Sequence, residues 1–279
     1  MPEWTDGDVD VDGVRIHYTR TGGEKPPFVL VHGFSDDGLC WTPVAEVLQA
    51  DYDVVMMDAG GHGRSAAPES GGYDSRSQAH DVQTVIETLQ LSNPLILGHS
   101  MGAVTTMILA AVYPNTPRAI LLEDPPPWWV APTEDADEVA ARNAAGFTAW
   151  LTDLQSKSRE QLIEEAGAEN PNWPQAELGP WADSKLRFRL KAVAAVAGRR
   201  PHQEVDWEAL LKQITCPVLL ITADQELGAI LSPAAVEMIR EWVPQTQISH
   251  IAQAGHSIRR DQFGPYLQAV KGFVSSIAS

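Results

Sequence analysis

The sequence contains only two cysteines among its 279 residues, Cys40 and Cys216. Two are too few for a disulfide framework or a thiolate metal cluster, so we expect both to be buried free thiols. The chain also lacks any apolar run of about 18 residues, which a membrane-spanning helix would need. Its first residues are acidic and have no apolar core of the kind found in a secretory signal. These absences predict a cytoplasmic protein with no membrane partner.

Positive charge is scarce as well, because 20 Lys and Arg stand against 37 Asp and Glu and the formal net charge is −17. Such a surface repels phosphate backbones and anionic headgroups, which disfavours nucleic acid as a partner. No nicotinamide, phosphate-binding or metal-binding motif occurs, and we therefore expect no cofactor and no metal. The expected ligand is a neutral small molecule, and the expected state is a monomer or a homodimer.

Short apolar runs alternate with segments of helical periodicity at both ends of the chain. The runs at 28–31, 95–97 and 218–221 are typical of strands buried on both faces of a sheet. Strands that alternate with helices indicate βαβ units and a mostly parallel sheet. Before them, an Asp12-Gly13 pair between two alternating segments predicts a hairpin.

A helical insertion is predicted for residues 126–205, where no strand-like run occurs. Ligands of open α/β sheets bind at the carboxyl ends of the strands, so we expect the insertion to cover that edge as a cap. Residues 1–125 and 206–279 then form the core domain. The expected helices of the cap cover residues 134–154, 159–168 and 181–197.

The sharpest local signal is Gly98-His99-Ser100-Met101-Gly102, which follows a strand-like run and precedes a helical one. In that context a G-x-S-x-G pattern is typical of a nucleophile elbow, a tight strand-to-helix turn that exposes its serine. The glycines remove side chains that would clash, and the helix N-terminus stabilises developing negative charge. Ser100 is therefore the predicted nucleophile.

A nucleophilic serine needs a histidine as its base and an acid that orients the histidine. Three histidines follow Ser100 in the chain. His202 falls in the predicted insertion and His250 within a predicted strand. His256 follows Gly255 in a loop between that strand and the last helix, from which its imidazole can reach the serine. His256 is therefore the expected base.

The acid is predicted from two loops. Glu226 is preferred because it follows a predicted strand and precedes His256 by enough residues for one helix and one strand. These elements would place the two loops side by side. Asp224 in the same loop, and the pair Glu123 and Asp124 after the preceding strand, are the alternatives.

Two backbone N–H groups are expected to form an oxyanion hole. One belongs to Met101, the residue after the nucleophile, and the other to Phe34, in the loop after the first buried strand. Gly33 allows that loop to turn sharply, and His32 is expected to support the turn from the interior.

The substrate is expected to contact Phe34, Trp128 and Trp129. The two tryptophans stand where the predicted insertion begins. Packing inside a helical subdomain is the alternative role for them.

These motifs, in this order, resemble the α/β-hydrolase superfamily over most of residues 8–125 and 206–278. The resemblance implies a mostly parallel, eight-stranded sheet with helices on both faces and an inserted helical cap. Family members usually carry Asp where this chain has Glu226. The resemblance rests on His32-Gly33, on the D-x-x-G-x-G-x-S turn from Asp58 to Ser65, on the elbow at 98–102 and on Ala254-Gly255-His256.

The triad and the resemblance together imply a serine hydrolase. The expected substrate is a small to medium, apolar, uncharged carboxylic ester or lactone, cleaved through an acyl-enzyme. Epoxide hydrolases and dehalogenases of the superfamily use an Asp nucleophile, which excludes both here.

Three other functions of the superfamily stay open. A perhydrolase differs from an esterase only in its oxyanion-loop geometry. A hydrolase-derived receptor of small molecules could keep the whole triad. A carbon–carbon bond hydrolase of a vinylogous diketone acid would hold the substrate carboxylate with a cap arginine: Arg142, Arg159, Arg187 or Arg189.

Overall fold

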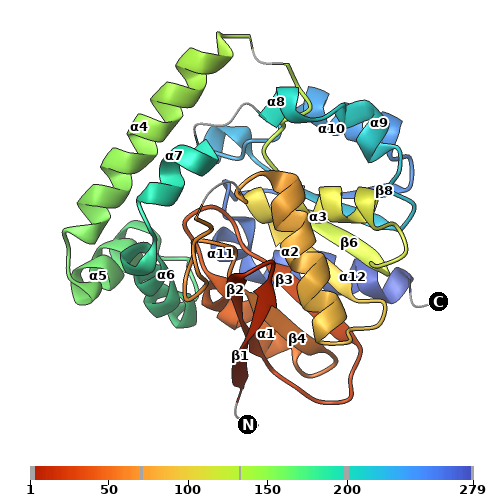
Figure 1. Ribbon diagram of the computed structural model, residues 1–279, viewed down its shortest axis with the longest axis horizontal. Coiled ribbons are helices and arrows are strands. Elements are labelled where there is room, and N and C mark those ends of the chain that lie inside the picture. The colour runs from red at the N-terminus through yellow and green to blue at the C-terminus, as the bar shows by residue number, and fades with distance from the viewer. Residues whose placement is uncertain (1–3, 70–71, 132, 198–200, 278–279) are drawn as a thin grey trace.

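The computed structural model describes residues 4–69, 72–131, 133–197 and 201–277. Its centre is one eight-stranded sheet with the strand order β1-β2-β4-β3-β5-β6-β7-β8 (Figure 1). Strand β2 pairs antiparallel with β1 and β4, and every other pairing is parallel, which confirms the predicted sheet. The strands are β1 Thr5–Val11, β2 Val14–Arg20, β3 Pro27–Val31, β4 Asp53–Met57, β5 Leu95–His99, β6 Ala119–Glu123, β7 Val218–Ala223 and β8 Thr246–Ile251.

Strands β1 and β2 form the predicted hairpin. Its two turn residues, Asp12 and Gly13, have φ values of 50° and 85°. Both therefore lie in the left-handed region that a two-residue hairpin turn of type I′ requires, and Asp and Gly tolerate it best. The register that follows pairs Val11 with Val14.

Alternate residues of each central strand enter different hydrophobic cores. In β3, Val29 and Val31 belong to one core, whereas Phe28 and Leu30 belong to the other. Because side chains alternate along a strand, one that is covered on both faces must be apolar throughout. The first core is closed by α2 (Ser75–Thr88) and α3 (Met101–Val112), and the second by α1 (Thr42–Leu48) and α12 (Phe263–Ser276).

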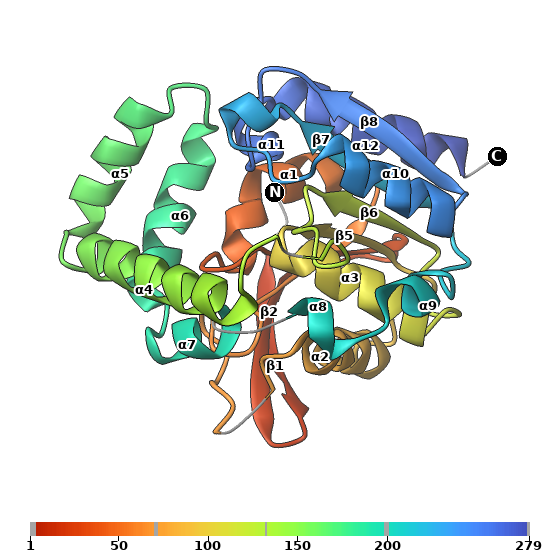
Figure 2. The same cartoon turned by 90° about the horizontal axis from the view of Figure 1, so that it is seen from above.

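Helices fill the described part of residues 126–205, for which the cap was predicted, and no strand occurs there. Figures 1 and 2 show α4 to α7 gathered at one side of the sheet. None of the helices in the described ranges combines the length and the apolar character needed to cross a bilayer. The insertion contains α4 (Ala136–Gln155), α5 (Arg159–Glu169), α6 (Gln175–Arg187), α7 (Lys191–Ala197) and α8 (Pro201–Glu204); three further helices of the core are α9 (Trp207–Leu211), α10 (Pro233–Trp242) and α11 (Ile258–Asp261).

The prediction of one helix over 181–197 is wrong, because the chain breaks between α6 and α7. Phe188 ends α6 in an extended conformation, with φ −61° and ψ 133°. Its ring is buried and packs against the ring of Phe34, with 5.1 Å between the centroids. The break therefore places an aromatic side chain of the insertion on the loop that follows β3.

The fold disfavours the charged form of Asp81, which lies in α2. Burial, with the nearby Asp12 and Asp74, raises the pKa of Asp81 to about 7. In the unfolded chain Asp81 loses its proton near pH 4, whereas in the native state it keeps the proton up to about pH 7. This difference lowers the free energy of unfolding progressively between about pH 4 and 7, and by a constant amount above pH 7.

We expect Asp81→Asn to raise the free energy of unfolding at pH 8 by up to about 4 kcal/mol, because the amide mimics the neutral acid. Below about pH 4 the substitution should have little effect, because the acid is then protonated in both states. Denaturant unfolding at pH 4 and pH 8 measures both values, and an equal effect at the two would contradict the assignment.

Candidate active site

The turn between β5 and α3 holds Ser100 in a strained conformation, with φ 52° and ψ −119°. A Cβ atom on Gly98 would lie 2.2 Å from the carbonyl oxygen of Gly102, and one on Gly102 would lie 2.3 Å from that of Val31. Backbone atoms of α3 and of the end of β3 therefore approach this turn so closely that only glycine fits at positions 98 and 102. A non-glycine residue in such a conformation costs about 1–3 kcal/mol and is typical of functional sites.

We expect Gly102→Ala to lower the free energy of unfolding by about 2–4 kcal/mol, because the added methyl group meets backbone atoms that cannot move aside. Gly272→Ala is the matched control, since Gly272 lies within α12 and a Cβ there has no neighbour within 4 Å. The control should be neutral or stabilising by up to about 1 kcal/mol. Equal unfolding free energies in the two variants would contradict the close approach.

The two backbone N–H groups expected to form an oxyanion hole belong to the start of α3 and to the loop after β3. Met101 is the first residue of α3, so its N–H has no acceptor within the helix. A Cβ on Gly33 would lie 3.2 Å from the Cβ of Ser100, which places the Gly33–Phe34 peptide beside the serine.

His32 is fully buried and supports this loop, as the sequence predicted. Its Nδ1–H donates to the carbonyl of Gly33 at 2.8 Å, and its Nε2 accepts from the backbone N–H of Ala59 at 2.9 Å. Both ring nitrogens are therefore used in holding backbone, and none is left for direct catalysis.

His256 lies beside the nucleophile turn. His99, which precedes Ser100, donates its Nε2–H to the backbone carbonyl of His256 at 3.0 Å, and the two rings are 4.7 Å apart. The Nδ1 of His256 donates to Oδ2 of Asp124 at 2.7 Å. A carboxylate can only accept, so the proton of the neutral ring lies on Nδ1. The lone pair is then on Nε2, where a base needs it.

The acid at His256 is Asp124, the residue after β6. Its side chain is fully buried and accepts backbone N–H groups from Ile230 at 2.9 Å and Leu231 at 3.1 Å. Asp124 has φ 40°, another left-handed residue at the carboxyl edge of the sheet. These donors fix the carboxylate and leave it able to orient the imidazole.

The structure contradicts the preference for Glu226, which lies in a short 3-10 helix (Gln225–Leu227) whose side chains are not buried. Its neighbour Asp224 accepts from Nε2 of His250 at 3.0 Å and does not contact His256. The error has a physical reason. Both candidate loops follow strands at the same edge, and the residues after Glu226 bend back to bind Asp124.

Glu123 is excluded as well, because the chain turns between it and Asp124. Its side chain is fully buried on the far side, where Oε1 accepts from the N–H of Arg259 at 3.0 Å and Oε2 from the hydroxyl of Tyr266 at 3.1 Å. Burial raises the pKa of Glu123, and Arg259 opposes the rise.

The wall beside the serine is aromatic and uncharged. The ring of Phe34 packs edge-on against Phe147 of α4 at 4.9 Å, against Phe188 at 5.1 Å and against His62 at 6.1 Å. Burial lowers the pKa of His62 to about 3, so this ring is neutral. Tyr73 packs against the same group and against Met101. Phe147, Phe188 and Tyr73 were not found from the sequence, because nothing in it says which aromatic residue of an insertion faces inward.

The two tryptophans expected to contact the substrate both pack on the core of the sheet. Trp129 is buried in the core beneath α3, where its Nε1–H donates to the carbonyl of Ala235 at 3.1 Å. Trp128 is partly buried and packs on the same core. Both therefore pack on the core of the sheet and not inside the helical subdomain, where the alternative had placed them.

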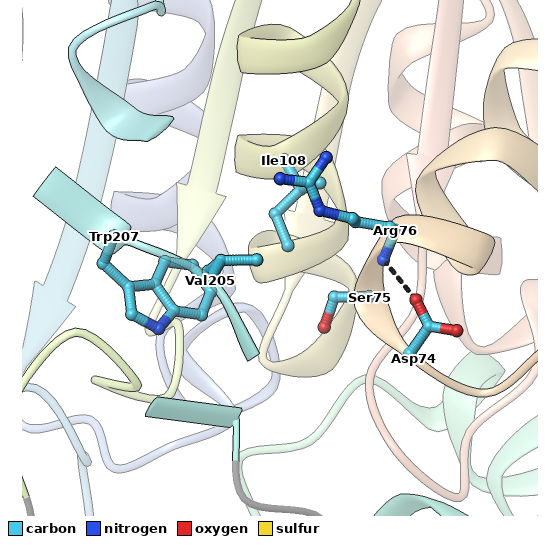
Figure 3. A pocket seen from close by; sticks show the side chains of 6 residues that line it. All are labelled: Asp74, Ser75, Arg76, Ile108, Val205 and Trp207. Atoms are coloured by element: carbon cyan, nitrogen blue, oxygen red, sulfur yellow. Dashed lines mark hydrogen bonds between the residues drawn. The ribbon is translucent and has the colours of Figure 1, made fainter. Parts of the chain in front are cut away.

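A separate cavity of about 270 Å³ opens between the start of α2, the middle of α3 and the segment before α9 (Figure 3). It is not the site described above, since neither Ser100, Asp124 nor His256 lines it. The lining residues are Asp74, Ser75, Arg76, Ile108, Val205 and Trp207.

Comparison with known proteins identifies the family of this fold. A sequence profile described as the alpha/beta hydrolase fold matches residues 26–259. The chain belongs to this family. Members with solved structures include an esterase from Rhodococcus, which is 25% identical and superimposes with a TM-score of 0.75 over 99% of this chain and all of its own.

Two curated relatives align over nearly the whole chain. An N-formylmaleamate deformylase of Pseudomonas putida is 26% identical over 274 residues, which is 96% of each chain. A 2-(acetamidomethylene)succinate hydrolase of Mesorhizobium japonicum is 26% identical over 275 residues, covering 96% of this chain and 94% of its own. The protein is thus a hydrolase, and its relatives include proteins named as lipases and an esterase.

Proposed function

We propose that this protein is a serine hydrolase that transfers an acyl group from a carboxylic ester or lactone to water. The observation that carries the proposal is the strained Ser100 turn next to the His256–Asp124 pair. Nε2 of His256 takes the proton of the Ser100 hydroxyl as the oxygen attacks the carbonyl carbon. The N–H groups of Phe34 and Met101 then stabilise the oxyanion.

The same groups complete the acylation of Ser100 and then hydrolyse the acyl-enzyme. Asp124 stabilises the imidazolium, which gives its proton to the leaving alcohol and leaves Ser100 acylated. His256 next takes a proton from water as the water oxygen attacks the acyl carbon. The imidazolium then gives this proton to the Ser100 oxygen as its bond to the acyl carbon breaks, which releases the acid and restores both side chains. A lactone fits the same scheme, with the alcohol still tethered to the acyl group.

The pairing of most candidate arginines in the insertion supports an uncharged substrate. Three of its four candidate arginines are neutralised by carboxylates: Arg142 by Glu134 at 2.9 Å, Arg159 by Asp183 at 2.7 Å, and Arg187 by Asp37 at 3.3 Å. The fourth, Arg189, donates to the backbone carbonyl of Ser65 at 2.7 Å. With the aromatic wall, this favours a small to medium, apolar acyl or alcohol group.

The acid assignment makes a direct prediction. We expect Asp124→Asn to lower kcat by about 10³- to 10⁴-fold, because the amide removes the charge and the acceptor that set the His256 tautomer. Glu226→Gln, the matched control from the neighbouring loop, should change kcat less than about twofold, since its side chain is exposed. Steady-state kinetics on an activated ester measures both, and a reversed order of the two effects would restore Glu226 as the acid.

The reaction class is tested with a substrate panel and a serine-directed fluorophosphonate. We expect one label on Ser100, turnover of neutral short-chain esters or lactones, and a loss of about 10³-fold or more in Ser100→Ala. The panel should include an amide and carboxylate-bearing diketones, because the two curated relatives carry names of a deformylase and a succinate-derivative hydrolase. Turnover of the charged diketones alone would favour a carbon–carbon bond hydrolase, and binding without any turnover a receptor.

A further inference from the structure

Six charged side chains, three of each sign, are buried together behind the active-site loops. Each has at most 4% of its surface exposed, although ionised groups are rarely buried to this extent. The cluster joins four parts of the chain: the loop after β3, the end of β6, the segment after His256 and helix α6 of the insertion. Its members are Asp36, Glu123, Glu177, Lys185, Arg259 and Arg260.

Asp36 is the centre of this cluster and lies two residues after Phe34. Its Oδ1 accepts from Nζ of Lys185 at 2.6 Å, and its Oδ2 accepts from Arg260 at 2.8 Å and from Arg259 at 3.3 Å. Burial alone would raise the pKa of Asp36, but the three cations hold it well below the usual range. The carboxylate is therefore held in its charged form by the three cations.

Lys185 is the only member of the cluster whose hydrogen bonds also reach the backbone of the loop after β3. It comes from α6, and its ammonium donates to Asp36, to the carbonyl of Ser35 at 3.0 Å and to the Oγ of Ser184 at 3.2 Å. An ammonium has three protons, so these contacts use all of its donors. The side chain has one geometry and cannot turn elsewhere.

The carbonyl that Lys185 holds belongs to a strained residue. Ser35 has φ 65°, in the left-handed region that disfavours serine. It follows directly on Phe34, whose N–H is a donor of the proposed oxyanion hole. A loop held in such a conformation relaxes unless its surroundings fix it, and a small relaxation at Ser35 would move the Phe34 peptide.

Stability alone is a poor explanation for this contact. Buried ion pairs often contribute little, because desolvation of both charges offsets their attraction, and apolar replacements of similar volume can be as stable. A role in positioning the loop explains the contact better. A shift of about 1 Å in a group that stabilises a transition state can lower the rate by about 10²-fold.

We propose that Lys185 is a positioning residue through which the insertion sets the oxyanion hole: it clamps Ser35 and Asp36, and so holds the Phe34 N–H where the oxyanion forms. The proposal rests on the proposed acyl-transfer function. It gives the insertion a role in the rate of the reaction besides covering the site.

The test compares Lys185→Met with Lys157→Met, a control that removes a lysine of the same insertion and its surface pairs with Asp153 and Glu165. We expect Lys185→Met to lower kcat by about 10- to 100-fold, somewhat less than the loss of an oxyanion donor itself, with KM changed less than about threefold. The rate of Ser100 labelling by the fluorophosphonate should fall by a similar factor, because the phosphonyl oxygen uses the same N–H groups. The control should leave both rates unchanged.

A second substitution separates positioning from a structural role. Ser35→Gly removes the conformational cost at this residue, because glycine adopts positive φ freely. Placed in the Lys185→Met background, it should restore at least about a third of the lost labelling rate on a logarithmic scale. A cluster that only stabilised the fold would show a lower Tm in Lys185→Met with kcat and labelling unchanged, and this result would overturn the proposal.

Asp36→Asn, which keeps the shape of the side chain, is the second variant should Lys185→Met fail to fold. It removes the anchor of Lys185 and is judged by the same labelling rate, with unchanged labelling counting against the proposal. A wild-type protein that neither labels nor turns over esters would instead contradict the proposed function. A wild type that labels while both variants keep its full rate would overturn the positioning role alone.

Discussion

The close approach of α3 to the end of β3 is the constraint on which the rest of the site depends. It is possible only because Gly98 and Gly102 have no Cβ atom, and it forces Ser100 into a left-handed conformation. The N–H of Met101 has no helical acceptor because Met101 begins α3, and the loop of Gly33 lies beside the serine. One close approach therefore sets the backbone of the proposed nucleophile and brings both proposed oxyanion donors near it.

The protons around the serine are placed by hydrogen-bond geometry. His99 must carry its proton on Nε2 because that atom faces a backbone carbonyl, and burial lowers its pKa well below the usual range. His256 must carry its proton on Nδ1 because that atom faces the carboxylate of Asp124. His32 donates from Nδ1 and accepts at Nε2. Each tautomer follows from a neighbour that can only accept or only donate, so the base is ready without any rearrangement.

The sequence was sufficient for the features that local rules determine. Apolar runs predicted the central strands because both faces of the sheet are covered, and the G-x-S-x-G pattern predicted the turn because its glycines are required by backbone contact alone. The acid was different. Glu226 and Asp124 both follow strands at one edge, and the choice between them depends on how residues 230 and 231 fold back, which is a long-range contact. The inward turn of Phe188 and the partners of Lys185 depend likewise on packing between distant segments.

The charge of the molecule and the charge of its site are nearly independent. The chain carries a formal charge of −17, yet the buried cluster behind the active-site loops holds three acids and three bases, and the wall around Phe34 is aromatic. For the proposed reaction, an unpaired buried anion near Ser100 would oppose the oxyanion, whereas Asp36 is compensated by three cations. The acidic exterior repels anions that come within about 10 Å at moderate salt. The compensated charges and aromatic rings inside leave the reacting carbonyl as the place where negative charge develops. The proposed substrate, which is uncharged until an anion develops in the transition state, suits both conditions.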